Sequence, residues 1–443
     1  MDAASEAEWS ALTYAHHRTA ASAAAPGATF IGRMDNLAQT LVGAALGRAV
    51  ADRKVPGAAL LGALAGNAPD WQELLCSPGA LVPRFGPPPP PQPPPPTSYL
   101  LYQGGITHSL LGAVAEMAAL SALAGLVLHW HARRTGTRPA PWRWIAALVA
   151  ATVAGHLWLD WQGSYGVRPL LPWNTRWYSA DWIAIVDPFF WIVPLPALAW
   201  GARRHWLPAL GYIVTLLGVI ALVVWAGHPT PAAWVLLGVL GGVTCVAGWM
   251  RHWFGVARRR EAAAYALLVL AAYVGANAAV SLWGKASVHA TAIRRFGPEA
   301  QWAALAVVGH PFRREPIYAG ADTVAGRGWA VPRHLTHPAV VRALATPEGR
   351  SIAQLARFLA AEVDSSGSGQ RVYLRDARDH TVGPLEWAAV EVRLRRPRLC
   401  PPICRTRSRA CSGPRFGSTG SRRCRRSAPS TTRGTGFSSG TSP

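Results

Sequence analysis

Charged residues are scarce in this chain. They make up 15% of its 443 residues, whereas hydrophobic residues make up 50%. Such a composition excludes an ordinary soluble enzyme. Runs of about 20 mostly apolar residues are long enough to cross a bilayer. We find six such runs, at residues 106–128, 144–159, 182–200, 207–226, 232–250 and 262–283. The sequence therefore predicts a mainly α fold, a multi-pass helical bundle of about six spanning helices whose first partner is the lipid bilayer.

Several other features are missing. The six cysteines fit no common zinc-finger spacing. Residues 1–33 lack the basic and apolar regions of a signal peptide, and a better helical pattern opens at Met34. We therefore expect residues 1–33 to be a disordered or wrongly assigned extension. The chain shows no internal repeat, which disfavours a transporter.

Acidic residues are absent from the end of the chain. Residues 395–443 contain twelve Arg and neither Asp nor Glu, so they hold more than half of the net charge of +22. Without hydrophobic periodicity this segment cannot bury a core, and we expect a disordered basic tail. Much of the remaining positive charge flanks the apolar runs. The charge therefore does not form a folded basic face, and we expect no nucleic-acid partner.

The loops between the apolar runs alternate in charge. Segments 129–143, 201–205 and 251–260 are basic, whereas 227–231 has no Lys or Arg and 161–181 balances Arg168 and Arg176 with Asp181. The positive-inside rule places the basic loops in the cytoplasm. His108, His156, Asp160 and Asp187 then fall together on the outer side.

The rest of the chain divides by pattern. Two short helical patterns, 37–50 and 57–66, precede the runs and join them in a membrane domain at 34–284. This domain carries a Pro-rich insertion at 87–96, which we expect to be an extended loop. Residues 285–394 predict a small α+β domain on the outer side, with an amphipathic helix at 351–363. Its predicted strands are 303–308, 316–319, 371–374 and 387–394.

The polar residues at the ends of the apolar runs suggest a metal site. His156 and Asp160 are four residues apart, so on a helix they share one face and can bind the same ion. Ionisable groups at membrane depth are costly and usually functional. A hydrolytic metal needs about three protein ligands and an open position. We expect His108, His156 and Asp160 to hold the ion.

Six motifs occur in order along residues 34–394. They are MDNLAQTLVGAALG from Met34, NAPD ending at Asp70, GITHS around His108, HLWLDWQGSYGVRPLLPW from His156, DWIAIVDPFFW from Asp181 and VYLRDAR near the end. Together they resemble the bacterial inner-membrane metal-dependent hydrolases of unknown substrate. Two positions depart from the family pattern, since Gln39 and Gln103 stand where relatives usually have histidine.

The resemblance implies a multi-pass protein of the bacterial inner membrane that acts as a hydrolase. We expect a divalent metal, zinc, and attack of a metal-bound hydroxide on an ester or phosphoester of a small-molecule or lipid-like substrate. Asp70 and Asp187 would act as further metal ligands or as catalytic, proton-handling carboxylates. Arg168 and Arg176 would bind a phosphate or carboxylate of the substrate. The alternative is a catalytically inactive relative with a structural or stress-linked role, which Gln39 and Gln103 favour.

Each of these residues also has a plain structural interpretation. His108 could be an interfacial histidine beside a helix cap formed by Thr107. Asp70 could be a turn residue, and Asp187 could cap a helix that begins at Pro188. The two arginines could be ordinary loop charges. We expect Asp181 to be more exposed than Asp187 and less suited to a site.

Overall fold

The computed structural model describes most of the chain up to residue 395. The described residues are 36–71, 104–200, 238, 242, 258–307, 310–365, 369–378 and 388–395. The predictions for residues 1–33, the Pro-rich insertion 87–96, the apolar run 207–226, Gln103 and the tail beyond residue 395 lie outside them. The run 232–250 does too, apart from Gly238 and Gly242.

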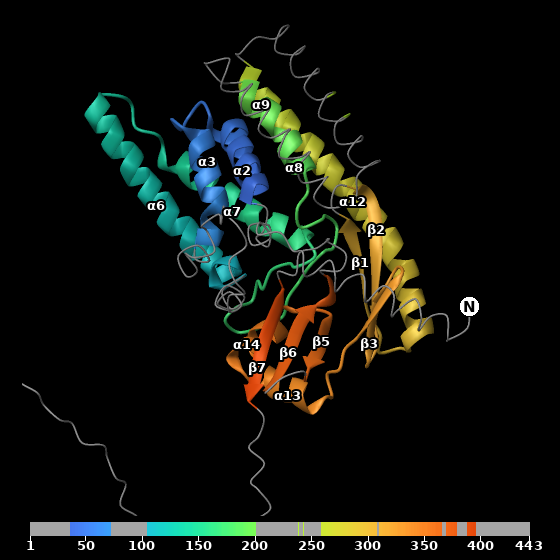
Figure 1. The fold of residues 1–443 in the computed structure, drawn as a ribbon. Helices are drawn as coiled ribbons and strands as arrows, with labels where there is room; N and C mark the ends of the chain where they lie inside the picture. The colour runs from blue at the N-terminus through green and yellow to red at the C-terminus, as the bar shows by residue number, and fades with distance from the viewer. Residues whose placement is uncertain are drawn as a thin grey trace, which may run out of the picture. The chain divides into compact units, whose positions relative to one another are not determined.

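Three described helices are long and apolar enough to span a membrane. They are α6 (Leu110–Thr135), α7 (Trp142–Gln162) and α12 (Arg259–Phe296), and they coincide with three of the six predicted runs. Helices α6 and α7 pack against each other (Figure 1). The residue that caps α6 is Ser109, whose hydroxyl accepts a hydrogen bond from the Gly112 amide, so the Thr107 cap was wrong. Gly136, with φ of 67°, ends the helix in the left-handed conformation that favours glycine.

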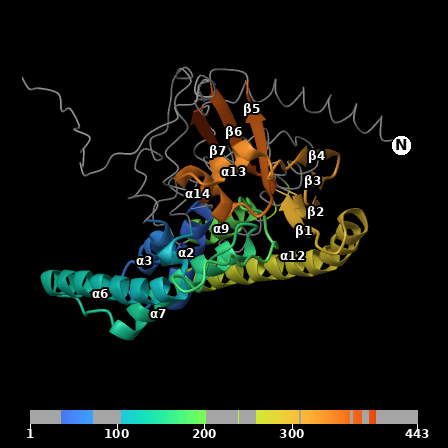
Figure 2. The ribbon, with the colours of Figure 1, turned by 90° about the horizontal axis from the view of Figure 1, so that it is seen from below.

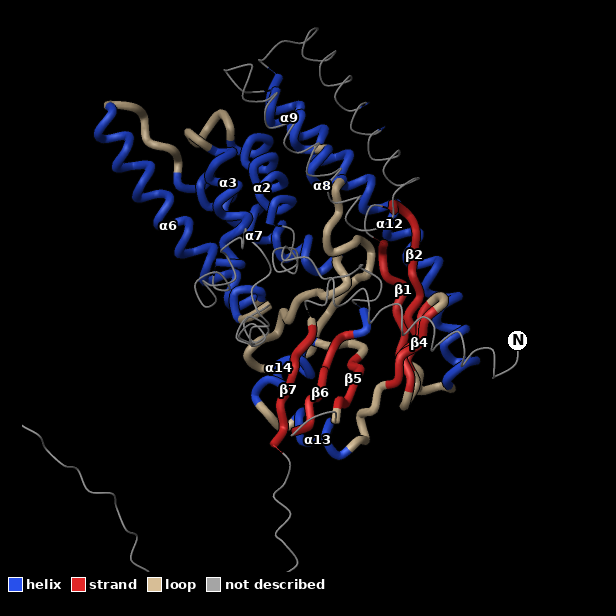
Figure 3. The backbone as a smooth tube through the Cα atoms, in the orientation of Figure 1, coloured by secondary structure: helices blue, strands red, loops and turns tan. Residues whose placement is uncertain are grey.

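The apolar run 182–200 does not form a helix of spanning length. An extended loop leads from α7 to two short helices, α8 (Phe189–Ile192) and α9 (Pro194–Trp200), as Figure 3 shows. Proline lacks the amide hydrogen that a continuous helix needs, and its ring clashes with the preceding turn. Pro188 and Pro194 therefore divide the run into pieces that are each shorter than a bilayer span, and a spanning helix at this place stays a prediction.

The two short N-terminal helical patterns are confirmed as α2 (Asn36–Ala51) and α3 (Ala58–Asn67). Their backbones come into direct contact through glycines spaced four residues apart. A Cβ added to Gly43 would lie 2.4 Å from the Gly62 carbonyl oxygen, and one added to Gly47 would lie 2.1 Å from that of Ala58. Small residues at this spacing let two helices approach closely. The pair forms a tight hairpin that also packs on α7.

The described residues of the basic segments 129–143 and 251–260 lie at one end of the helices. The turn between α2 and α3 shares a buried cluster with the start of α7, in which Val55 packs with Ile145. Arg259 at the start of α12 pairs with Asp52 of the same turn, at 2.6 Å. The arginines between α6 and α7 belong to this end as well. His108, His156 and Asp160 lie at the opposite ends of their elements, which agrees with the loop charges, and the side of the membrane stays a prediction.

The C-terminal part contains two antiparallel sheets. The four strands β1 to β4 are paired in sequence order, and the three strands β5 to β7 likewise, with helices α13 (Pro338–Leu344) and α14 (Pro347–Leu355) between the two sheets in the chain. The strands are β1 (Gln301–Val307), β2 (His310–Ala319), β3 (Thr323–Gly326), β4 (Trp329–Pro332), β5 (Leu359–Asp364), β6 (Gly369–Asp376) and β7 (Ala389–Arg395). All four predicted strands are therefore confirmed, and the described residues add β3, β4 and β5.

The predicted helix 351–363 is only half right. Helix α14 ends at Leu355, and β5 follows with six residues paired to β6, from Leu359 opposite Asp376 to Asp364 opposite Arg371. The strand buries Ala360 and Ala361. Strand pairing and burial override the local helical pattern here.

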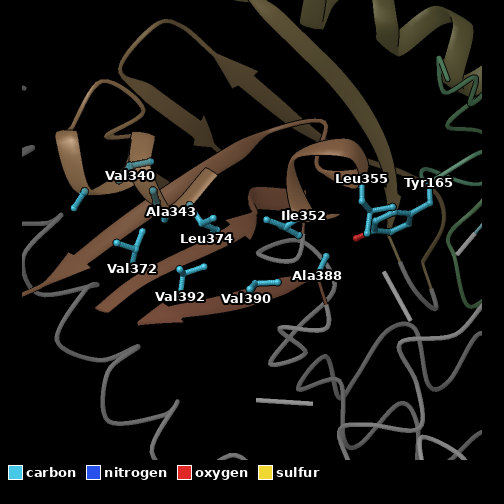
Figure 4. Packing of buried hydrophobic residues seen from close by; sticks show 12 residues of the cluster. Tyr165, Val340, Ala343, Ile352, Leu355, Val372, Leu374, Ala388, Val390 and Val392 are labelled. Atoms are coloured by element: carbon cyan, nitrogen blue, oxygen red, sulfur yellow. The ribbon is translucent and has the colours of Figure 1, made fainter. Parts of the chain in front are cut away.

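Both sheets contact the rest of the protein. Strands β1 and β2 pack along α12, which continues well past the predicted domain boundary at residue 284 (Figure 2). Strands β6 and β7 share a core with α13 and α14, and Tyr165 from the loop after α7 lies in that core beside Leu355 (Figure 4). This loop thus joins the end of α7 to the second sheet.

A candidate metal centre

Four polar side chains gather where α3 ends and α6 begins, against the last turns of α7. His156 and Asp160 are on α7, one turn apart. His108 is in the short 3₁₀ helix η4 (Ile106–His108), and Asp70 ends the 3₁₀ helix η2 (Ala68–Asp70) that follows α3. All four are buried. The helical hairpin thus brings Asp70 to a pair that the four-residue spacing on α7 already placed together.

The nitrogen and oxygen atoms of these side chains converge. The Nε2 atoms of His108 and His156 are 3.1 Å apart. Asp70 Oδ1 lies 3.2 Å from His108 Nε2 and 3.7 Å from His156 Nε2. On the α7 side, Asp160 Oδ2 lies 3.2 and 3.3 Å from the same two nitrogens. Among the described residues, Asp70, His108 and His156 form a group whose ligand atoms lie within 4.8 Å of one another.

Hydrogen bonds on the far side of each ring aim Nε2 at the centre. His156 Nδ1 lies 2.7 Å from the Gly66 carbonyl oxygen, so Nδ1 carries the proton and donates it. The Thr107 hydroxyl donates to the Pro69 carbonyl and therefore accepts from His108 Nδ1, at 3.2 Å. Such contacts orient the imidazoles of metal sites and fix their tautomer. Both rings are held with Nε2 toward Asp70 and Asp160.

The three atoms of Asp70, His108 and His156 fit a divalent cation. Tetrahedral zinc with bonds of about 2.0–2.1 Å separates its ligand atoms by about 3.3–3.4 Å, and the three separations here are 3.1, 3.2 and 3.7 Å. Two imidazoles and a carboxylate are a common donor set for catalytic zinc. The buried Asp/His/His group can therefore bind a metal ion, and Asp160 lies beside it.

Protons compete with a cation for this centre. Burial alone would lower the pKa of His108, but the hydrogen bonds and charges of Asp160 and Asp70 outweigh it and raise the pKa well above its ordinary value. Metal ligands bind in their deprotonated form. A cation that binds here must therefore displace the proton of His108.

A cavity lies on the other side of Asp160. Its lining comes from the start of α2, the end of α7, the loop before α8 and α8 itself. The lining residues are Ala38, Gln39, Leu159, Asp160, Gln162, Gly163, Tyr165, Ile183, Ala184, Ile185, Asp187 and Phe190. Gln39 donates its amide to Asp160 Oδ1 at 2.9 Å, so the residue that departs from the family pattern orients a carboxylate of the metal centre.

Asp187 lines this cavity apart from the cluster of imidazoles. Its Oδ1 accepts the Phe189 amide at 3.0 Å, as in the predicted helix cap, and its Oδ2 accepts the Tyr273 hydroxyl at 2.8 Å. Burial raises the pKa of Asp187 to about 6, although Tyr273 and the Phe189 amide oppose the shift. The carboxyl group can therefore hold a proton near neutral pH, and its role as a ligand stays a prediction.

The two predicted substrate arginines lie elsewhere in the loop after α7. Arg168 is buried, donates to the Gly104 carbonyl oxygen at 3.1 Å and stacks on the Trp177 ring at 4.7 Å. Arg176 is exposed and lies over Tyr178. Both have contacts that suit a structural role, and binding of a substrate anion stays a prediction.

Sequence reasoning missed the polar contacts between the helices and the sheets. Asp181 is only 2% exposed, contrary to our expectation, and it pairs with Arg357 at 3.0 Å. Arg378, from the VYLRDAR motif, pairs with Asp376 at 2.5 Å and donates to the Ser164 carbonyl oxygen. Two motifs far apart in the sequence thus meet beside the cavity. No spacing rule could reveal this contact, because the two motifs are more than 200 residues apart in the sequence.

Comparison with known proteins supports the membrane assignment. Residues 34–229 match a family model described as YdjM inner membrane protein. The match begins at Met34 and includes every residue of the metal centre. It supports a bacterial inner-membrane protein family, in agreement with helices apolar enough to span a membrane. No curated protein and no solved structure matches the chain significantly.

Proposed function

We propose that this protein is a multi-pass inner-membrane hydrolase that uses one divalent metal ion, zinc, to cleave an ester or phosphoester at the outer face. The observation that carries the proposal is the buried group of Asp70, His108 and His156, with ligand atoms 3.1 to 3.7 Å apart. Charged groups are rarely buried unless they are paired or bind a metal.

Different side chains of the protein would bind the metal ion and transfer protons. His108, His156 and Asp70 would hold the ion, which would acidify a water molecule and polarise the substrate oxygen. Asp160 faces both imidazoles and is oriented by Gln39, so it can serve as a fourth ligand or accept a proton from water. Asp187, across the cavity, can return a proton to the leaving group because its pKa lies at about 6.

The metal content of the purified protein tests this proposal. The full chain is reconstituted in nanodiscs, and its zinc, manganese and iron are measured by mass spectrometry. We expect about one zinc ion per chain and its loss in His156→Ala. The control is His131→Ala, which changes an exposed histidine on α6 and should keep the metal. Equal, near-zero metal in all three proteins would reject the site.

A catalytically inactive relative is the second candidate function. Gln39 favours it, because an amide is a poor metal ligand and supplies no proton at neutral pH. In the structure this amide donates to Asp160, where a histidine would have offered a further ligand or acid. A metal-loaded protein that hydrolyses none of a panel of nitrophenyl esters and phosphoesters would support this candidate, and turnover lost in Asp70→Asn would reject it.

A further inference from the structure

The cavity beside the metal centre contains polar groups that the protein leaves unused. Gln162 is 1% exposed, and neither its amide nitrogen nor its amide oxygen has a hydrogen-bond partner. The Oε1 atom of Gln39, 4% exposed, has none either. Both side chains line the cavity. Buried amides without partners are rare among native proteins and costly, because they lose their bonds to water.

The other polar groups of the cavity are already engaged. Both oxygens of Asp187 accept hydrogen bonds, from Tyr273 and Phe189. Asp160 accepts from Gln39 through Oδ1 and faces the two imidazoles through Oδ2. Among the described lining residues, the amides of Gln162 and Gln39 have atoms without a hydrogen bond, whereas Asp160 Oδ2, which also has none, faces the two imidazoles.

The hydrogen-bonding atoms of these amides indicate which chemical groups a ligand must present. An amide side chain offers both donors and an acceptor, whichever way its two ends are assigned. An anion would leave the acceptors unused and would face Asp160 and Asp187, since the lining has no Lys, Arg or His. A cation would leave the Gln162 donors unused. A hydroxyl group both donates and accepts, so it satisfies Gln162 and Gln39 together.

The apolar part of the lining fits the same kind of ligand. Leu159, Ile183, Ile185 and Phe190 face the cavity with Tyr165. Ligand sites are mostly apolar, with a few polar groups that fix orientation. A sugar or polyol presents hydroxyl edges and carbon-bound hydrogens on its faces, and such a lining matches both.

We propose that this cavity binds a neutral polyhydroxyl group, a sugar or polyol, which is part of the molecule cleaved at the metal centre. That the bound molecule is cleaved depends on the proposed function, whereas binding of the polyhydroxyl group in the cavity does not. Gln162 and Gln39 would hold the hydroxyl groups, and Asp160 would separate them from the metal ligands. The substrate would then be a glycosylated or polyol-bearing ester, either soluble or part of a lipid headgroup.

Binding can be measured without catalysis. The full chain is placed in phosphatidylcholine nanodiscs, since maltoside detergents would themselves compete, and is treated with a chelator. Saturation-transfer NMR then reports contact with methyl glucoside, inorganic phosphate or ethanolamine. We expect transfer to methyl glucoside only. A second set of nanodiscs, doped with monoglucosyl diacylglycerol, shows by competition whether the lipid form binds more tightly than the soluble sugar.

Two variants test the assignment to Gln162. Gln162→Leu should reduce methyl glucoside binding at least tenfold, and Gln354→Leu, on the exposed face of α14, should not. The Gln162→Leu protein should unfold at a higher temperature than wild type without ligand, because it removes an unsatisfied amide, so lost binding cannot be ascribed to misfolding. His156→Ala should keep the binding, which separates failure of the metal site from failure of this cavity. Binding of phosphate or ethanolamine in place of the glucoside, or equal glucoside binding by Gln162→Leu, would overturn the proposal.

Discussion

Each histidine of the metal centre is oriented by a hydrogen bond at Nδ1, the ring nitrogen that faces away from the centre. For His108 this contact comes from Thr107, whose hydroxyl also ties η4 to Pro69. The same hydroxyl therefore positions two ligands, His108 and the neighbouring Asp70. It does so without touching the ion itself.

Replacing Thr107 with valine should weaken metal binding while the fold is retained. Valine keeps the shape but removes both hydrogen bonds, and loss of such an outer contact typically costs about 10–100-fold in metal affinity. Zinc affinity of the reconstituted protein measures the effect. Thr137→Val, in the exposed turn after α6, is the control. Equal affinity in both variants would show that Thr107 does not orient His108.

Asp187 should make the protein less stable as the pH rises. Its pKa is raised from 3.8 to about 6 in the folded state, so the folded protein holds this proton more tightly than the unfolded chain does. The stabilisation is present below pH 4 and is lost as the pH rises through about 6, which amounts to about 3 kcal/mol.

The variant Asp187→Asn isolates this effect, because asparagine stays neutral. The difference in unfolding free energy between variant and wild type should grow by about 2 kcal/mol from pH 4 to pH 7. Unfolding curves across this pH range measure it. A difference that stays constant with pH would mean that Asp187 is ionised throughout.

For single residues, the sequence predicted contacts between side chains that are close in the chain. It missed contacts that depend on how distant segments fold together. His156 and Asp160 could be placed together from helical geometry alone. Asp70 required the resemblance, because its position depends on the α2–α3 hairpin. Gln162 carried no signal, since an amide at a helix end is ordinary until its burial is known. Asp181 was expected to be more exposed than Asp187, because its partner Arg357 lies far along the chain and the sequence does not show that the two residues meet.

Among the elements, the α2–α3 hairpin depends on contact between backbones. A Cβ on Gly62 would lie 2.2 Å from the Gly43 carbonyl oxygen, and neither helix can yield without moving the other. The end of α3 carries the Gly66 carbonyl that holds His156 and leads into Asp70. The glycines thus position half of the metal centre.

The substitution Gly62→Ala should destabilise the protein and weaken its metal site. Overpacking of this kind costs about 1–3 kcal/mol, and α3 must shift away from α2. Thermal unfolding and zinc content report the two effects. Gly275→Ala, where nothing lies within 4 Å of the added Cβ, should instead be neutral or stabilising by up to about 1 kcal/mol. Similar behaviour of both variants would argue against close packing.

Whether a segment forms a helix or a strand could be predicted where a single hydrophobic pattern covers the whole segment. The helices α6, α7 and α12 follow from continuous apolar runs. The run 182–200 was just as apolar, but the prolines at 188 and 194 divided it. The segment 351–363 had a helical pattern throughout, yet its second half pairs with β6. Pairing between distant strands cannot be read from a local pattern.

At the scale of the whole molecule, Asp181 links the helices to both sheets. It accepts hydrogen bonds from Arg357, which precedes β5 and also donates to the Trp302 carbonyl oxygen of β1. Lys285 of α12 lies 3.9 Å from the same carboxylate. A buried carboxylate with two cationic neighbours therefore anchors the C-terminal region.

Loss of Arg357 should loosen this anchor. Arg357→Met leaves Asp181 buried with only the more distant Lys285, and we expect a loss of about 1–3 kcal/mol, reduced from the fully buried case because Arg357 is partly exposed. Limited proteolysis of residues 300–395 should become faster. Arg393→Met, which removes the exposed pair with Glu391, should change the rate little. Unchanged proteolysis in Arg357→Met would show that the ion pair is dispensable.

The orientation of the molecule in the membrane can be tested by labelling. Arg53 and Thr135 lie at the basic end of the helices, and Glu348 lies in α14 of the C-terminal region. In a chain whose native cysteines are replaced by serine, an impermeant thiol reagent should label cysteine at position 348 in intact cells but not at 53 or 135. The reverse pattern would place the metal centre on the cytoplasmic side.

Helix α12 joins the bilayer to the first sheet in one piece. Its 38 residues extend about 57 Å, whereas the hydrocarbon layer is about 30 Å thick. A continuous helix does not stretch, so a membrane of different thickness is accommodated mainly by a change of tilt. Strands β1 and β2 are fastened to this helix and would swing with it. We therefore expect the thickness of the surrounding lipid to change the position of this sheet relative to the membrane surface.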